Sequence, residues 1–171
     1  MTKFNLRKTI LAALFCALAV VGAFVKFGPG SSIALDAMPA FLAALLMGGP
    51  YGAIVAVVGH MVSAAISMFP MSLPLHLAVA VEMGIIAFAV GLIAGPFKKT
   101  TPLRVTVASV AAFILNGFVS PLILVVWPGM GWGAYAGMVW LLALASGVNA
   151  AAAYVLFFAL RKPYDSIVLR S

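Results

Sequence analysis

The chain has 171 residues, of which 65% are hydrophobic and only 8% are charged, and its mean hydropathy is +1.23. A soluble domain carries about 25% charged residues, so this composition cannot cover a water-facing surface and indicates an integral membrane protein. The net charge of +7 does not indicate a nucleic-acid-binding protein, because the basic residues stand in short clusters between apolar runs.

The sequence lacks the residue patterns of the main catalytic and metal-binding classes. Cys16 is the only cysteine and lies in an apolar run, so there is no disulfide framework and no cysteine metal site. There is no G-x-x-x-x-G-K-[ST] phosphate loop for ATP hydrolysis. His60 and Ser63 lack the acidic residue and the G-x-S-x-G elbow that a catalytic triad would need. The histidines and carboxylates also lack the spacing of a zinc or di-iron site. We therefore expect no enzyme activity, no metal and no cofactor.

Six apolar segments separated by glycine, proline or charged residues predict an all-α membrane protein, a bundle of six transmembrane helices in a single domain over residues 1–171. Residues 1–25 also fit a secretory signal. However, the apolar run continues to Val25 without a polar segment near the cleavage position, so we expect a retained first helix. The helices are expected near residues 6–25, 36–48, 50–68, 74–96, 102–127 and 134–160.

Capping residues support these boundaries, and the second helix is unusually short. Asp36 and Ser72 can cap the second and fourth helices through their side chains. The second helix has about 13 residues and a length of about 20 Å, whereas the hydrocarbon core of a membrane is about 30 Å thick. It therefore begins below the membrane surface, under the segment 26–36, which is rich in glycine, proline and serine. A recessed cavity and a re-entrant structural loop would both explain this arrangement.

The basic residues predict the orientation of the chain in the membrane. With both termini in the cytoplasm, nine of the ten basic residues lie on the cytoplasmic side, as the positive-inside rule requires, and only Lys26 lies outside. We therefore expect a multi-pass protein of a cell membrane of the bacterial type. The residues expected on the cytoplasmic side are Lys3, Arg7, Lys8, Lys98, Lys99, Arg104, Arg161, Lys162 and Arg170.

A few polar residues interrupt the apolar segments. Glu82 lies about 12 Å from the outer end of the fourth helix, and His60 lies at nearly the same depth on the third. Because an ionised side chain is costly in hydrocarbon, these two residues should pair with each other or share a polar ligand. We favour a ligand cavity over a purely structural pair, because Trp140 can reach the same level. Asn116 and Asn149 lie deeper and are typical of hydrogen bonds between helices.

Aromatic residues gather at the outer ends of the last two helices. An aromatic belt at the membrane surface explains part of this distribution. Stacking on a flat heterocyclic ligand would explain why they concentrate at one end of the molecule. These aromatic residues are Trp127, Trp132, Tyr135 and Trp140.

Residues 35–64, LDAMPAFLAALLMGGPYGAIVAVVGHMVSA, resemble the substrate-binding S component of energy-coupling factor (ECF) vitamin transporters. The similarity lies in a short helix that opens with a proline, an apolar run, the Gly-Pro-x-x-Gly turn of residues 49–52, and a helix with a polar residue in its outer half. The six helices, the chain length and the small-x-x-x-small step from Ala13 to Ala17 extend the resemblance over the whole chain.

The resemblance implies a binding subunit that captures a vitamin from outside and works with a transmembrane coupling protein and two ATPase subunits. It further implies that Ala13 and Ala17 form the docking face for the coupling protein. The substrate would lie under the outer loops, at the outer halves of the last three helices. The candidate substrate-binding residues are therefore Glu82, His76, Trp127, Trp132, Tyr135 and Trp140, with His60 and Asn116 as deeper members.

The lack of basic residues in the apolar segments narrows the range of possible substrates. The apolar segments offer no Lys or Arg in the region of the site, which disfavours a strongly anionic vitamin such as folate. We favour a cobalamin precursor such as α-ribazole, followed by riboflavin or pantothenate. The alternative is a self-sufficient, proton-coupled secondary transporter of a small organic solute, with Glu82 and His60 as a proton relay. Such transporters often contain two related halves, and we find no internal repeat here.

Overall fold

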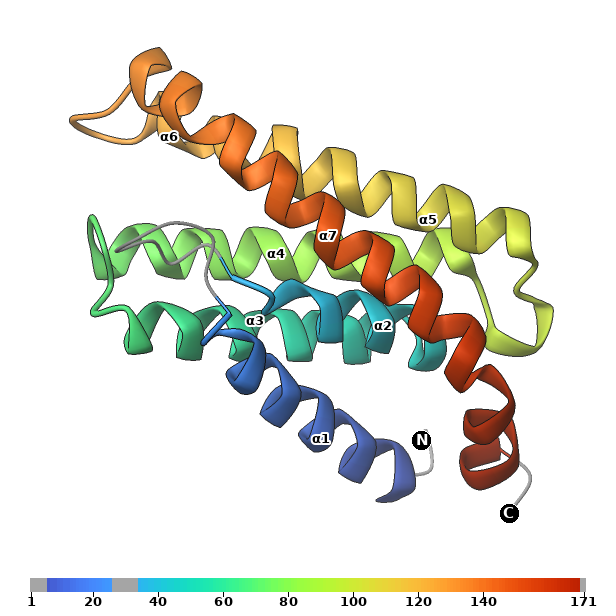
Figure 1. Cartoon of the computed structure of the whole chain (residues 1–171). Coiled ribbons are helices and arrows are strands. Elements are labelled where there is room, and N and C mark those ends of the chain that lie inside the picture. Colours follow the sequence, from blue (N-terminus) through green and yellow to red (C-terminus); the bar gives the residue numbers. More distant parts are fainter. Residues whose placement is uncertain (1–5, 26–33, 170–171) are drawn as a thin grey trace.

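The computed structural model describes residues 6–25 and 34–169, and these residues form six helical segments (Figure 1). The fifth segment is continuous from residue 102 to residue 126 but changes its helical type along its length. The bounds of the helices lie within four residues of those expected from the sequence. They are α1 Leu6–Gly22, α2 Ala37–Met47, α3 Gly49–Ile66, α4 Leu73–Ala94, α5 Pro102–Ile114, α6 Ile123–Val126 and α7 Trp132–Tyr164.

Four helical segments are long and apolar enough to cross a membrane: 49–66, 73–94, 102–126 and 132–169. α1 is 17 residues long, which corresponds to about 26 Å. α2 has only 11 residues, fewer than expected, and therefore extends over about half of a hydrocarbon core. The prediction of an all-helical membrane protein is thus confirmed.

α2 lies at the centre of the bundle. It contacts α1, α3, α4 and α7, and ten of its eleven residues are buried. A helix that is apolar on every side needs cover from protein or lipid on every side, and for α2 the neighbouring helices provide it. α3 and α4 pack against each other beside α2, whereas α5 and α7 cover the opposite side (Figure 1).

Glycine permits the close packing at the turn between α2 and α3. Gly48 has a φ of 99°, a conformation that other residues rarely adopt, and it allows α3 to begin one residue after α2 has ended. A Cβ atom on Gly91 of α4 would collide with the backbone of Gly49. The end of α2 is therefore held in a fixed position against α4.

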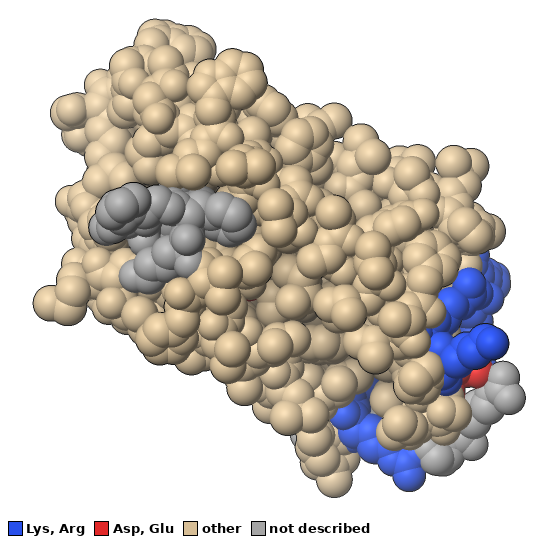
Figure 2. Space-filling view, in the orientation of Figure 1, with Lys and Arg blue, Asp and Glu red and all other residues tan. Residues whose placement is uncertain are grey.

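Basic side chains gather at one end of the bundle, the end that carries both described chain ends (Figures 1 and 2). We call it the basic end. Arg7 also connects the two chain ends here, because its Nη1 donates a hydrogen bond to the carbonyl of Ile167 at 3.1 Å. Lys3, Lys26 and Arg170, three further residues of the orientation argument, lie outside the described residues. The residues of the basic end are Arg7, Lys8, Lys98, Lys99, Arg104, Arg161 and Lys162.

Candidate functional site

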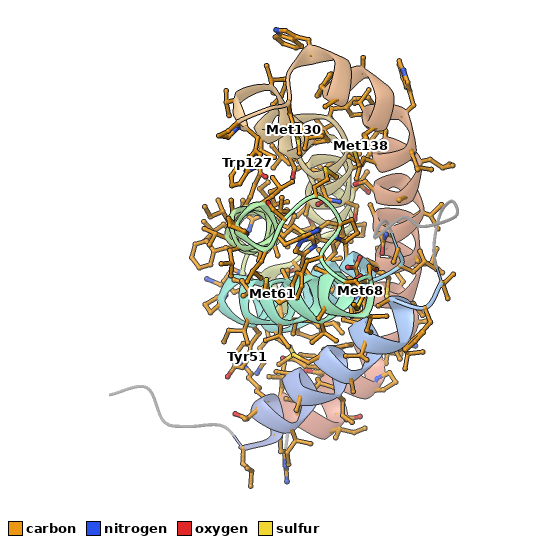
Figure 3. All side chains as sticks on the ribbon, turned by 90° about the vertical axis from the view of Figure 1, so that its left-hand side faces the viewer. Tyr51, Met61, Met68, Trp127, Met130 and Met138 are labelled. Atoms are coloured by element: carbon orange, nitrogen blue, oxygen red, sulfur yellow. The ribbon has the colours of Figure 1, made fainter. Side chains whose placement is uncertain are left out.

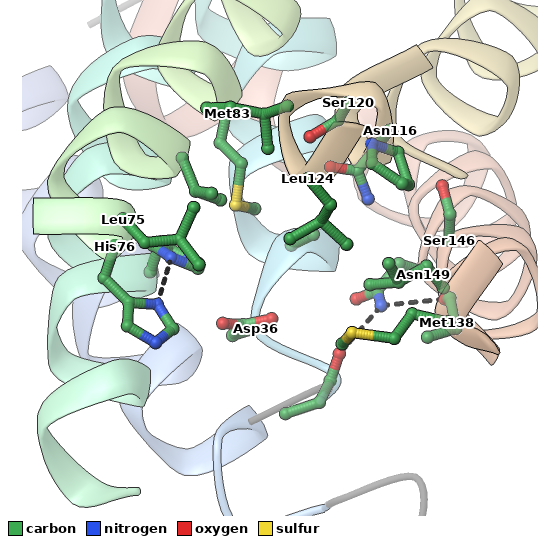
Figure 4. A pocket seen from close by; sticks show the side chains of 18 of the residues that line it. Asp36, Leu75, His76, Met83, Asn116, Ser120, Leu124, Met138, Ser146 and Asn149 are labelled. Atoms are coloured by element: carbon green, nitrogen blue, oxygen red, sulfur yellow. Dashed lines mark hydrogen bonds between the residues drawn. The ribbon is translucent and has the colours of Figure 1, made fainter. Parts of the chain in front are cut away.

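A cavity of about 110 Å³ lies in the half of the bundle opposite the basic end, between the start of α2, the end of α3, the start of α4, the residues before α6 and the first half of α7 (Figure 4). Its wall is largely apolar, with a small set of polar side chains, as is usual for small-molecule sites. The polar side chains in the wall are Asp36, His60, His76, Asn116, Ser120, Ser146 and Asn149.

Asn149 of α7 organises the start of α2. Its Oδ1 accepts a hydrogen bond from the backbone N–H of Met38 at 2.6 Å. Its Nδ2 donates to the carbonyls of Ala34 at 3.0 Å and Ala145 at 2.9 Å. Asn149 thus satisfies a backbone N–H in the first turn of α2, which is normally the task of the preceding side chain. The expectation that Asn149 joins two helices agrees with these hydrogen bonds.

Asp36 occupies the position before α2, but its side chain makes no capping hydrogen bond, so the expected cap is wrong. The reason is that Asn149 already accepts the N–H of Met38. The carboxylate of Asp36 instead faces the cavity, between His76 and Met138 (Figure 4), and only 7% of the residue is exposed. By contrast, Ser72 caps α4 as expected, by accepting a hydrogen bond from the N–H of Leu75 at 3.3 Å.

Burial controls the protonation of this carboxylate. It raises the pKa of Asp36 from 3.8 to about 6, because the charged form loses its water. Hydrogen bonding to the nearby Ser63 hydroxyl and to the backbone N–H groups of Asp36 and Ala37 acts in the opposite direction. The Ser63 oxygen lies near the carboxylate but makes no hydrogen bond of standard geometry within the described chain.

Two histidines form a hydrogen-bonded chain at the edge of the cavity. His76 Nε2 lies 2.9 Å from the carbonyl of Pro70, and because a carbonyl only accepts, this nitrogen donates. In a neutral His76 the other nitrogen, Nδ1, is then an acceptor for His60 Nε2 at 3.1 Å. This chain of hydrogen bonds fixes the tautomer of both rings and holds them next to the cavity.

The fifth segment departs from α-helical geometry where it reaches the cavity. Residues 115–119 form a π-helical turn and residues 120–122 a 3₁₀ turn. Pro121 explains the change, because it cannot donate the backbone hydrogen bond that an α-helix needs and its ring would collide with the carbonyl four residues earlier. The irregular turns bring Asn116 and Ser120 to the cavity wall. The carbonyl of Phe118 accepts a hydrogen bond from the Tyr135 hydroxyl at 3.3 Å.

The composition of the cavity wall is that of a binding site for a small molecule. The chain matches the family model "ECF transporter, substrate-specific component" over residues 7–162. The chain belongs to this family. No curated protein matches the chain significantly. As an S component, the protein is a substrate-binding, non-catalytic subunit of a vitamin-type transporter and a multi-pass membrane protein.

Three of the eight expected substrate-binding residues line the cavity of this S component: His60, His76 and Asn116. Glu82 lies outside the cavity wall and accepts a hydrogen bond from the Ser120 hydroxyl at 3.0 Å. His60 and Glu82, which we expected to pair or to share a ligand, are therefore engaged with different partners, His76 and Ser120.

The four aromatic residues do not line the cavity of this S component. Trp132 and Trp140 are 67% and 74% exposed. Tyr135 contacts the ring of Trp132 and donates its hydroxyl hydrogen bond to the backbone. Figure 3 looks onto the end of the bundle opposite the basic end, and there Trp127 and Met130 lie on the far side of α4 from Met61 and Met68. This arrangement fits an aromatic belt at the membrane surface.

Ala13 and Ala17 of α1 face away from the bundle. Ala12, Phe15 and Ala19 are buried against the neighbouring helices, whereas Ala13 and Ala17 are exposed. A helix from another protein could therefore approach α1 closely along this step.

Sequence reasoning missed Asp36, Ser120, Ser146 and Asn149 as members of the cavity wall. A signal was available for the last two. The buried residues of α7 follow the spacing of one helical face, through Val139, Ala143, Ser146 and Ala150. Polar residues on this face point into the bundle, whereas Trp140 lies about 100° away from Val139.

Proposed function

We propose that this S component captures a vitamin or vitamin precursor from the outer side of a cell membrane and delivers it with an ATP-driven ECF module. The observation that carries the proposal is the mostly apolar cavity with seven polar side chains in the half opposite the basic end. By the positive-inside rule the basic end is cytoplasmic, together with both termini, so the cavity belongs to the outer half of the membrane.

The substrate contacts come from the cavity wall. His60, His76 and Asn116 contact the substrate directly, whereas Glu82 acts by holding the Ser120 hydroxyl. Trp127, Trp132, Tyr135 and Trp140 surround the outer mouth, where they anchor the fifth and sixth segments in the membrane surface. Among vitamins we favour a cobalamin precursor such as α-ribazole, followed by riboflavin or pantothenate.

Energy for uptake comes from partner subunits. The module consists of a transmembrane coupling protein and two ATPase subunits, and the coupling protein docks on α1 at Ala13 and Ala17. Both alanines are exposed, so a partner helix meets no side chain larger than a methyl group at these two positions. The alternative, a proton-coupled transporter, finds less support, because its expected relay residues His60 and Glu82 contact different partners.

Two measurements test the proposal. Mass spectrometry of the protein purified in detergent should identify a co-purified vitamin or precursor, and uptake of that compound in cells should require co-expressed coupling and ATPase subunits. Uptake by the S component alone that collapses with a proton uncoupler at constant ATP would contradict the proposal and support the secondary transporter.

A further inference from the structure

Asp36 gives the cavity its electrostatic character. It is the only carboxylate in the cavity wall, and no Lys or Arg stands among the described residues that line the cavity. The described basic side chains lie instead at the opposite end of the bundle. A carboxylate that is 7% exposed needs hydrogen-bond donors or a cation to compensate for the water it has lost.

The side chain of Asp36 makes no capping hydrogen bond to α2. Asn149 takes the place of Asp36 as the cap of α2, because its Oδ1 accepts a hydrogen bond from the N–H of Met38 at 2.6 Å. The two histidines nearby are engaged with each other and with the carbonyl of Pro70. The first turn of α2 also favours a negative charge at this position, because the N-terminus of a helix carries partial positive charge.

The remaining wall fits a flat ring. Leu75, Met83, Leu124 and Met138 surround the space in front of the Asp36 carboxylate, and the polar side chains Asn116 and Ser120 lie on the side of the fifth segment (Figure 4). Methionine side chains adapt to irregular shapes and make favourable contacts between sulfur and aromatic rings. A ring held among these side chains can present its polar substituents to Asp36 at one edge.

We propose that Asp36 is the polar anchor of the substrate, and that the substrate is a flat heterocycle without net negative charge that donates O–H or N–H hydrogen bonds to this carboxylate. The inference rests on the proposed function and narrows it. Uncharged heterocycles with hydroxyl groups and cationic heterocycles with amino groups both belong to this class. An anion such as pantothenate does not, because its carboxylate would meet a second negative charge and no cation in the described wall.

Binding measurements on purified, ligand-free protein test the inference. The probes are α-ribazole and riboflavin as uncharged heterocycles, thiamine as a cationic one, and pantothenate and biotin as anions. We expect wild type to bind a probe of the first two kinds, and Asp36→Asn to weaken that binding about 10- to 150-fold, as for the loss of a charge-assisted hydrogen bond. The control variant Asp165→Asn removes a carboxylate at the basic end, away from the cavity, and should change the affinity less than about threefold.

The outcomes separate this inference from the proposed function. Tight binding of pantothenate or biotin alone would overturn the substrate class and leave vitamin capture intact. Unchanged affinity in a folded Asp36→Asn variant would overturn the role of Asp36. Equal losses in Asp36→Asn and Asp165→Asn would also overturn it, because removal of any carboxylate would then have the same effect. If none of the five probes binds, the inference and vitamin capture both fail.

Discussion

Removal of the Asp36 charge should stabilise the substrate-free protein. The folded protein holds the Asp36 proton up to a pH of about 6, whereas the unfolded chain releases it near 3.8. Between these values the folded state binds more protons than the unfolded state, so stability falls as the pH rises from about 4 to 6 and stays low above that range. A difference of this size corresponds to about 3 kcal/mol, since one pKa unit equals about 1.4 kcal/mol.

Thermal unfolding in detergent measures this effect. At pH 7.5, ligand-free Asp36→Asn should be more stable than wild type by up to about 3 kcal/mol, or about 6–12 °C in Tm. At pH 4.5 most of the difference should disappear, because the wild-type carboxyl is then largely protonated. His60 and His76 face the same cavity and are present in both proteins, so the comparison isolates Asp36. A variant that is less stable than wild type at pH 7.5 would refute the reasoning and give Asp36 a structural role.

Three further predictions concern other parts of the molecule. Ala13→Trp and Ala17→Trp should leave substrate binding intact but abolish uptake and complex formation, because an indole ring prevents close helix approach; normal assembly of both variants would remove α1 as the docking face. Single cysteines at Lys98 and Met130, in a background without the native cysteine, should be labelled from inside and outside respectively, and labelling from one side would contradict the topology. Asn149→Ala should cost about 2–5 kcal/mol of stability, because the Met38 N–H and the buried Ala34 carbonyl lose their partner; a loss below about 1 kcal/mol in the same thermal assay would contradict this role.

The helices could be predicted from the sequence because each one depends on local signals. Apolar runs of sufficient length with proline in the first turn locate α2, α3 and α4, and the glycines after α2 and α4 mark the ends of these two helices. The irregular turns of the fifth segment were less accessible. Pro121 lies inside an apolar run, and whether it kinks a helix, ends it or produces a π-helical turn depends on the packing around it.

The cavity was less predictable because its polar residues come from distant parts of the chain. Asp36 before an apolar helix has the local pattern of a cap, and only Asn149, 111 residues after Met38, changes its role. Glu82 stood out as an acidic residue in an apolar run, but its helical phase directs it to Ser120 and out of the cavity wall. The depth of a residue along its helix thus indicated the level of the cavity in the bundle. To predict whether the side chain faces the cavity, the phase of the helix was needed as well.

The shortness of α2 makes its length decisive for the position of Asp36. The end of α2 is fixed at the turn of Gly48 and Gly49, where the backbone lies against Gly91, and the opposite end of α2 carries Asp36 to the cavity. Adding or deleting one residue within α2 would rotate Asp36 by about 100° and move it by about 1.5 Å along the helix axis. An insertion of one residue in α2 would therefore turn Asp36, the anchor that we propose, away from the cavity altogether.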